Sequence, residues 1–196
     1  MRPIALALPL SLLATAAHAA CPSDPWQRME LRDSGGGVSV YERLNETTLR
    51  EMIREKDAET DYVYELRHGI FILTEYELRD GAEVPGTRSQ ASYDIPEADL
   101  PRPVAGLRWS GTAVHVNGAD RYEELLSLVV SPGAEVTYGA CSYPALALTL
   151  TVTYEGGASI QRFDFLPDLD IAVLRQLSEP GEPDLIYDPV AFTVRP

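Results

Sequence analysis

His115 and Asp120 are the residues whose types and spacing come nearest to a chemical site in this sequence. They flank Asn117-Gly118, a dipeptide typical of a two-residue hairpin turn, and a turn there would place the two side chains directly opposite each other. A carboxylate beside an imidazole orients and charges it, which is half of an acid–base or nucleophilic arrangement. Opposite charges on paired strands also stabilise a sheet without any chemistry. We therefore keep His115 and Asp120 as catalytic candidates that still lack a nucleophile.

Other patterns that could support catalysis or ligand binding are incomplete. Ser110 precedes a glycine, but Arg108 stands where a Gly-x-Ser-x-Gly motif needs its first glycine. The sequence has neither a His-x-x-x-His pair nor a Cys-x-x-Cys pair, so we expect no metal site and no cofactor. The glycines at 35–37 join two predicted strands and open no helix that could hold a phosphate. His68 falls in a predicted turn, where we expect a solvated side chain.

The clearest structural signal is a hairpin over residues 145–166. Apolar residues alternate strictly with threonine and alanine before Gly156-Gly157, where we place a two-residue turn. Pairing back from that turn sets Leu150 opposite Phe163, with one apolar face and one mixed polar face.

A second hairpin is predicted over residues 62–79. A three-residue loop at 67–69, with Gly69 in the left-handed position, puts Tyr64 on the same face as Ile72.

The remaining segments indicate a chain made mainly of strands. Residues 38–44 and 190–195 read as strands, and segments 48–55 and 168–177 fit either a helix or a strand, of which we favour the strand. Residues 81–104 carry four prolines and no periodicity, so we expect a long loop. The fold class is mainly β, an antiparallel meander forming a barrel or sandwich with at most one or two short helices.

The beginning of the chain is typical of a secretory signal peptide over residues 1–19. Arg2 supplies a short basic region, residues 4–17 are mostly apolar, and small residues precede a predicted cut between Ala19 and Ala20. No segment approaches about 18 uninterrupted apolar residues, so we expect no transmembrane helix. Export then leaves a single β-rich domain over residues 20–196, in the periplasm or outside the cell.

The two cysteines, Cys21 and Cys141, are predicted to form one disulfide in an oxidising compartment. Cys21 lies next to the predicted cut, which raises the alternative of a lipid anchor on that residue. His18 stands where lipoprotein signals usually carry an aliphatic residue, so we disfavour the anchor.

Charge narrows the choice of partners. The chain carries 30 Asp and Glu against 16 Lys and Arg, a formal net charge of −14, which excludes most nucleic-acid binding. We expect an exported, non-catalytic interaction or structural module that contacts an unknown protein. The alternatives are a lipocalin-like carrier of a small apolar ligand and a hydrolase-type enzyme using His115 with Asp120.

Overall fold

The computed structural model describes residues 20–195, so the predicted signal peptide lies outside the described residues. The described chain forms one antiparallel sheet of 14 strands and a short 3-10 turn, η1 (Glu97–Asp99). The strands are β1 (Met29–Asp33), β2 (Val38–Arg43), β3 (Thr48–Arg54), β4 (Asp61–Arg67), β5 (Phe71–Arg79), β6 (Ala82–Glu83), β7 (Ser89–Tyr93), β8 (Arg108–Asn117), β9 (Asp120–Tyr138), β10 (Cys141–Tyr154), β11 (Gly157–Leu166), β12 (Ile171–Ser178), β13 (Leu185–Ile186) and β14 (Pro189–Val194). The prediction of a mainly β fold is confirmed.

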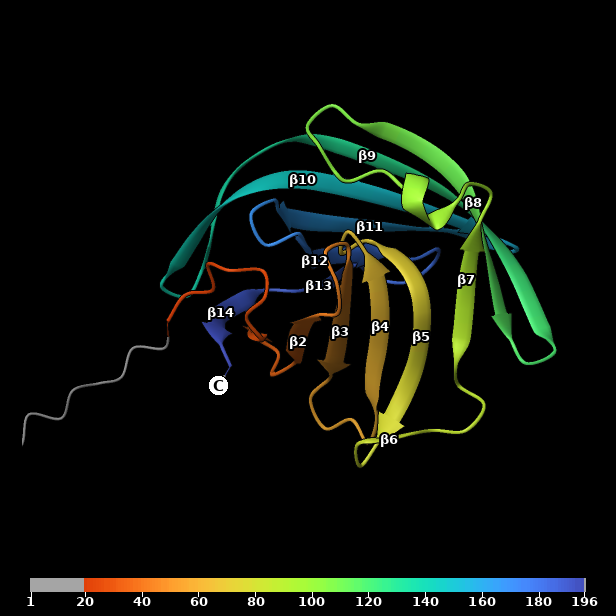
Figure 1. Ribbon diagram of the computed structural model, residues 1–196, viewed down its shortest axis with the longest axis horizontal. Helices are drawn as coiled ribbons and strands as arrows, with labels where there is room; N and C mark the ends of the chain where they lie inside the picture. Colours follow the sequence, from red (N-terminus) through yellow and green to blue (C-terminus); the bar gives the residue numbers. More distant parts are fainter. Residues whose placement is uncertain (1–19, 196) are drawn as a thin grey trace, which may run out of the picture.

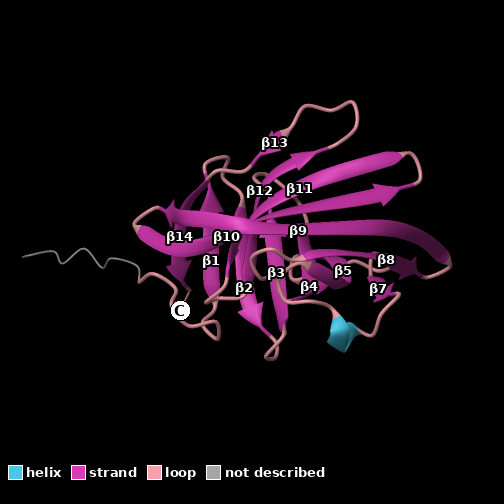
Figure 2. Ribbon diagram, turned by 90° about the horizontal axis from the view of Figure 1, so that it is seen from above, coloured by secondary structure: helices cyan, strands magenta, loops and turns pink. Residues whose placement is uncertain are grey.

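The sheet is a meander that folds over on itself without closing. Its order is β13-β12-β11-β10-β9-β8-β7-β5-β4-β3-β2-β1-β14, so nearly every strand pairs with its neighbour in sequence. Figure 1 shows β2 to β5 and β7 running upright, while β9, β10 and β11 arch across them. Figure 2, from above, shows the same long strands lying over the shorter ones. The sheet therefore has two parts, the shorter strands β2 to β5 and the long strands β9 to β11. They pack like the crossed layers of a sandwich within one continuous sheet (Figure 1).

The apolar core fills the space between the two parts of the sheet. The face that carries it, called the inner face below, takes alternate residues from each strand. The largest buried aromatic side chains are Tyr41, Phe71, Tyr138, Phe165 and Phe192. Burial of these rings supplies much of the driving force for folding over the sheet.

Both ambiguous segments are strands, as favoured, because each is stabilised by pairing on the sheet. Segment 48–55 contains β3, which lies between β2 and β4, and segment 168–177 contains most of β12. The expectation of a structureless loop over 81–104 was wrong, since that stretch contains β6, β7 and η1. β7 pairs with both β5 and β8, and so joins the two parts of the sheet.

The β10–β11 hairpin forms where it was predicted, with its register shifted by two residues. In the β10–β11 hairpin the turn is Glu155-Gly156, with Gly156 at φ 105°, so Leu148 and not Leu150 lies opposite Phe163. A shift of two residues leaves every side chain on its predicted face, and the hydrophobic pattern therefore could not distinguish the two registers. The positive φ of Gly156 is the local feature that selects the observed turn.

The β4–β5 hairpin has the predicted three-residue loop length, one residue further along the chain. Arg67 pairs with Phe71, so the loop is residues 68–70, and Gly69 has a φ of 68°. A bulge follows at Glu65/Leu66 and reverses the faces beyond it. Tyr64 consequently lies opposite Glu75. Ile72 lies opposite Leu66, which alternates with Tyr64, and so shares the face of Tyr64 as predicted, whereas Tyr76, beyond the bulge, lies opposite Val63 on the other face.

We expect Gly69→Ala to destabilise the protein by more than the roughly 1–2 kcal/mol that a left-handed non-glycine residue costs. A Cβ at this position would lie 2.8 Å from the backbone oxygen of Asp170, which cannot move aside easily. Gly81→Ala is the matched control, because Gly81 has a φ of 78° and no atom within 4 Å of the added Cβ. Urea unfolding of both variants measures the difference in their free energies of unfolding. Equal losses in the two variants would contradict the close contact between position 69 and the Asp170 backbone.

A disulfide joins Cys21 to Cys141, as predicted, across a sequence separation of 120 residues. The segment before β1 lies along β14, where the amide of Val194 donates to the carbonyl of Ala20 at 3.1 Å. A Cys21 sulfur bonded to Cys141 cannot also carry a thioether-linked lipid. Within residues 20–195 the structure has no helix with the length and hydrophobicity needed to cross a bilayer.

Candidate functional site

His115 lies on the inner face of β8, and its partner in the sheet differs from the prediction. The β8–β9 turn is Gly118-Ala119, so His115 pairs with Tyr122, while Asp120 pairs with Asn117. Gly118 has a φ of 59° and suits the first position of a two-residue turn, which moves the register by two residues. The pairing of His115 with Asp120 was therefore wrong.

Two other carboxylates flank the His115 imidazole. Its Nε2 atom lies 3.2 Å from Oε2 of Glu124, and its Nδ1 atom lies 3.9 Å from Oε1 of Glu75. The Tyr122 ring stacks on the imidazole with centroids 4.7 Å apart and planes 3° from parallel. The Tyr122 hydroxyl donates a hydrogen bond to Glu75 at 3.2 Å. These contacts fix the ring between two acids and beneath a tyrosine.

The register of the sheet extends this group into a line of side chains across the inner face. Glu51 of β3 lies opposite Tyr64 of β4, and Tyr64 lies opposite Glu75 of β5. Glu75 in turn lies opposite Ser89 of β7. The acidic row is the name used below for Glu51, Tyr64, Glu75, His115, Tyr122 and Glu124.

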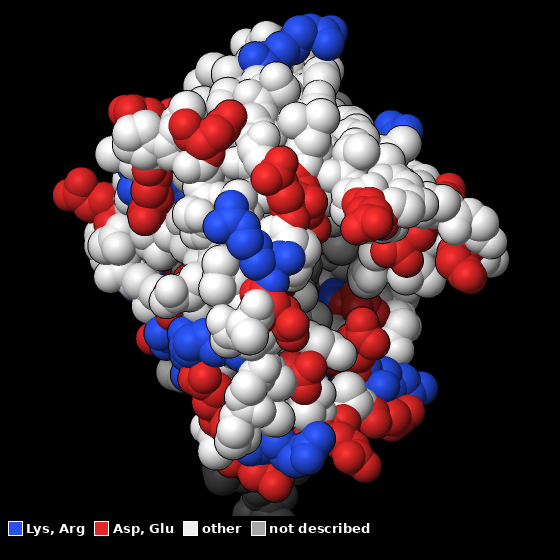
Figure 3. Space-filling view, turned by 90° about the vertical axis from the view of Figure 1, so that its right-hand side faces the viewer, with Lys and Arg blue, Asp and Glu red and all other residues white. Residues whose placement is uncertain are grey.

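The carboxylates of the acidic row have no basic partner except the histidine. In the described part of the chain, no Lys or Arg nitrogen lies within 4.0 Å of Glu51, Glu75 or Glu124. Other acids pair with arginines, as Glu65 does with Arg50. Figure 3 shows acidic side chains interspersed with fewer basic ones on the side that carries β7. Glu75 and Glu124 are thus carboxylates without a Lys or Arg partner, on an acidic protein.

Burial and neighbouring charges shift the pKa values of the acidic row. Burial raises the pKa of Glu51 to about 7, against the smaller opposing effect of the Tyr41 and Ser39 hydroxyls that face its carboxyl group. Burial, followed by repulsion from Glu75, raises the pKa of Tyr122 to about 12. The pKa of Tyr64 is raised by burial and then by the charges of Glu75 and Glu51.

Glu51→Gln should stabilise the protein at pH 8 by up to about 3 kcal/mol and flatten its dependence on pH. Because the pKa of Glu51 is higher folded than unfolded, the folded state binds more protons between about pH 4.5 and 7. The stability of the unsubstituted protein therefore falls as pH rises through that window. Urea unfolding at pH 5 and pH 8 measures the effect, with the exposed Glu42→Gln as control. Equal pH slopes for the protein and Glu51→Gln would contradict the burial of this carboxyl group.

The sequence prediction missed the carboxylates Glu75 and Glu124 for two different reasons. Glu75 reaches the site only because the bulge in β4–β5 turns it onto the inner face and β7 brings β8 alongside. Glu124 was missed because the predicted β8–β9 pairing placed it two residues further from His115 than the observed pairing does. Its alternation with Tyr122 was visible in the sequence and could have suggested that both share a face with His115.

The other described histidine belongs to a buried polar cluster at the far end of the β4–β5 hairpin. His68 was predicted to be solvated, but it is 8% exposed, and its Nδ1 atom lies 3.6 Å from Asp170. Arg43, whose side chain is 2% exposed, contacts Asp170 at 3.3 Å and donates to the carbonyl of Leu169. Arg102 donates to the same carboxylate at 3.0 Å. This cluster ties four separate parts of the chain together around one carboxylate.

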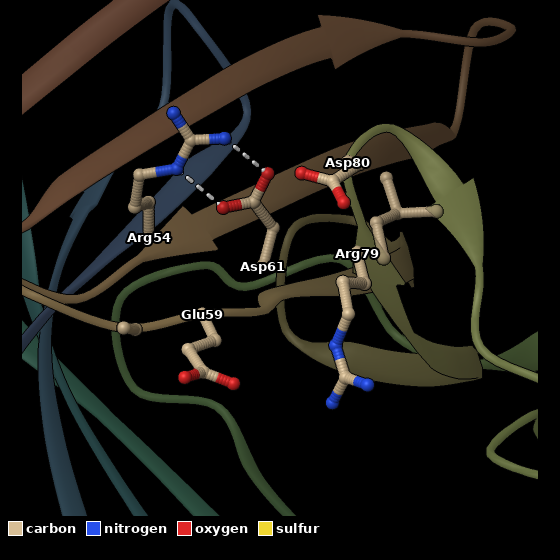
Figure 4. Close-up of a pocket in the computed structure, with 7 residues that line it drawn as sticks. Arg54, Glu59, Asp61, Arg79 and Asp80 are labelled. Atoms are coloured by element: carbon tan, nitrogen blue, oxygen red, sulfur yellow. Dashed lines mark hydrogen bonds and ion pairs between the residues drawn. The ribbon is translucent and has the colours of Figure 1, made fainter.

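A polar hollow lies at the surface of the described structure. It has a volume of about 510 Å³, is open to solvent, and is lined by Arg54, Ala58, Glu59, Asp61, Leu78, Arg79 and Asp80. Arg54 donates two hydrogen bonds to Asp61, so its charge is already neutralised. Figure 4 shows this pair facing each other, with Arg79 extending away from it. The lining of the hollow is therefore mostly polar.

Metal ligation and comparison with known proteins add no further assignment. Over residues 20–195, no group of three or more His, Cys, Asp or Glu side chains is arranged to hold a metal ion. The chain matches no protein family, no curated protein and no solved structure. We therefore argue a function from the acidic row, the group of titratable side chains described above.

Proposed function

We propose that the protein is an exported, non-catalytic binding module whose recognition site is the acidic row. The observation that carries the proposal is the set of three carboxylates on one face with no Lys or Arg partner among the described residues. Uncompensated charge is costly in a folded protein, and a bound partner of opposite charge would offset that cost. The exposed Tyr122 ring adds a flat aromatic contact, a feature frequent at recognition sites.

The surroundings of His115 support binding over catalysis. Its side chain is only 4% exposed, and the stacked Tyr122 covers it. A general base must lie within hydrogen-bond reach of the proton it removes from a substrate. The hydrolase alternative would need a nucleophile to converge on the imidazole.

The disulfide between Cys21 and Cys141 supports export. Disulfides persist in the periplasm and outside cells, whereas the cytosol keeps thiols reduced. Together with the signal pattern before Ala20, this favours a protein that works beyond the inner membrane.

Native mass spectrometry of the full chain, exported and purified from the cells that produce it, tests the binding module. We expect a bound species that is lost from Glu75→Gln/Glu124→Gln. Glu123→Gln/Glu155→Gln is the matched control, because it removes two exposed charges, one on β9 and one in the β10–β11 turn.

Three outcomes would count against the acidic row as the recognition site: a bare protein, a species retained by both double variants, or a species lost from both. An apolar molecule retained by both variants would favour the lipocalin-like carrier.

A further inference from the structure

Two buried polar atoms without a hydrogen-bond partner lie beside Glu75 at the exposed end of the acidic row, and the Glu75 carboxylate itself accepts one hydrogen bond, from Tyr122, but has no Lys or Arg partner among the described residues. Oε1 of Glu75 and Nδ1 of His115 lie 3.9 Å apart, too far for a hydrogen bond between them. Both Nδ1 of His115 and Oγ of Ser89 are buried without a hydrogen-bond partner. Ser89, 4% exposed, lies opposite Glu75 in the sheet. Its hydroxyl is close enough to the Tyr122 phenol to lower the phenol's pKa, though without ordinary hydrogen-bond geometry.

A neutral His115 with its ring proton on Nε2 has an acceptor at Nδ1. Glu124 lies 3.2 Å from Nε2 and favours the ring proton on that nitrogen. Nδ1 then presents a lone pair toward the Glu75 carboxylate, where two acceptors face each other. A donor between them would satisfy both, and a positively charged donor would also neutralise Glu75.

A primary ammonium group fits this set of acceptors better than other cations do. It carries three N–H donors that point in different directions, one for each of the three acceptors. A guanidinium group presents its donors in one plane and suits a bidentate carboxylate. A quaternary ammonium has the charge but no donor, and would leave Nδ1 and Oγ unsatisfied.

Access to the acceptors is controlled by Tyr122. Its side chain lies over His115 and is held by one hydrogen bond to Glu75, while the residue is 45% exposed. Rotation of this ring into solvent would open the space above the imidazole. The returning ring could then cover the cation with its electron-rich face.

We propose that Glu75, His115 and Ser89 bind a primary ammonium group, carried by a Lys side chain or by a free polyamine. This assignment rests on the proposed binding module and names the chemistry of its ligand. The two sources share the same charged head, and the formal net charge of −14 attracts both.

Calorimetric titration of the disulfide-closed protein tests the assignment with three probes. These are spermidine, a short Gly-Lys-Gly-Lys-Gly peptide, and the same peptide with trimethylated lysines. We expect the trimethylated peptide to bind at least about tenfold more weakly, because it keeps the charge and loses the donors. Tighter binding of spermidine would indicate a free polyamine, and tighter binding of the lysine peptide would indicate a protein partner.

Two variants and a spectroscopic measurement locate the binding. Ser89→Ala, which changes no charge, should weaken the better probe about tenfold, whereas Glu123→Gln should leave its affinity within about twofold. The ¹⁵N chemical shift of His115 Nδ1 should move toward that of a hydrogen-bonded acceptor on binding. Equal affinity for both peptides, or an unchanged Nδ1 shift at saturation, would overturn the proposal.

The two proposals fail in distinguishable ways. If Glu75→Gln/Glu124→Gln releases the co-purified species while no ammonium probe perturbs Nδ1, the ammonium assignment is wrong and the binding module stands. If the ammonium probes bind as expected while the co-purified species survives that substitution, the binding module is wrong and the ammonium site stands.

Discussion

Reduction of the disulfide between Cys21 and Cys141 should lower the free energy of unfolding by up to about 5 kcal/mol. The bond closes a loop with a sequence separation of 120 residues, and long loops lose the most entropy in the unfolded state when they are closed. For a domain of this size we expect the melting temperature to fall by about 10–20 °C. Thermal unfolding with and without reductant measures the effect.

The control for this prediction is Cys21→Ala/Cys141→Ala, whose melting temperature should not respond to reductant. Two free thiols in the exported protein, found by labelling under denaturing conditions, would contradict the disulfide. An unchanged melting temperature on complete reduction would contradict its contribution to stability.

Asp170→Ala should destabilise the protein by about 3–5 kcal/mol, because it leaves the buried Arg43 guanidinium without its carboxylate. Arg102 and His68 lose the same partner. Asp168→Ala is the matched control, since it removes an exposed carboxylate from the same turn. Urea unfolding at neutral pH compares the two variants, and a loss in Asp170→Ala no larger than in the control would contradict the role of the cluster.

The pH dependence of this cluster has a definite sign. Burial would raise the pKa of Asp170, but the nearby His68 and the hydrogen-bonded Arg102 outweigh it, and the pKa lies below its usual value. Stability from the ionised carboxylate is therefore present above the unfolded pKa and is lost as pH falls through the folded one. Asp170→Asn should lose less stability on acidification below about pH 4 than the unsubstituted protein does.

The acidic row and the buried cluster around Asp170 use charge in opposite ways. Arginines and a histidine surround Asp170, and the resulting contacts hold the folded sheet together. The carboxylate of Glu75 has only a distant imidazole and a phenol beside it. This contrast is the reason for assigning structure to one cluster and binding to the other.

Local sequence determined most of the strands, the faces of the β10–β11 hairpin and the disulfide of this protein. Alternation of apolar and polar residues over 145–166 fixes which side chains face the core, because the side-chain period of a strand is two. Two cysteines permit only one intramolecular pairing. Segments 48–55 and 168–177 were predicted as strands from the abundance of hairpins around them, and neighbouring strands supply the hydrogen bonds that settle them as such.

Tertiary structure alone decided which strands meet, and with that the composition of the acidic row. A shift of two residues preserves every face, so alternation could not tell whether Asp120 or Tyr122 lies opposite His115. The bulge that turns Glu75 inward is a change of one residue within a hairpin, which reverses the faces beyond it. Glu75 and Tyr122, separated by 47 residues, meet because β7 bridges β5 and β8. Local periodicity carries no information about such pairings, since they depend on how the whole sheet folds over its core.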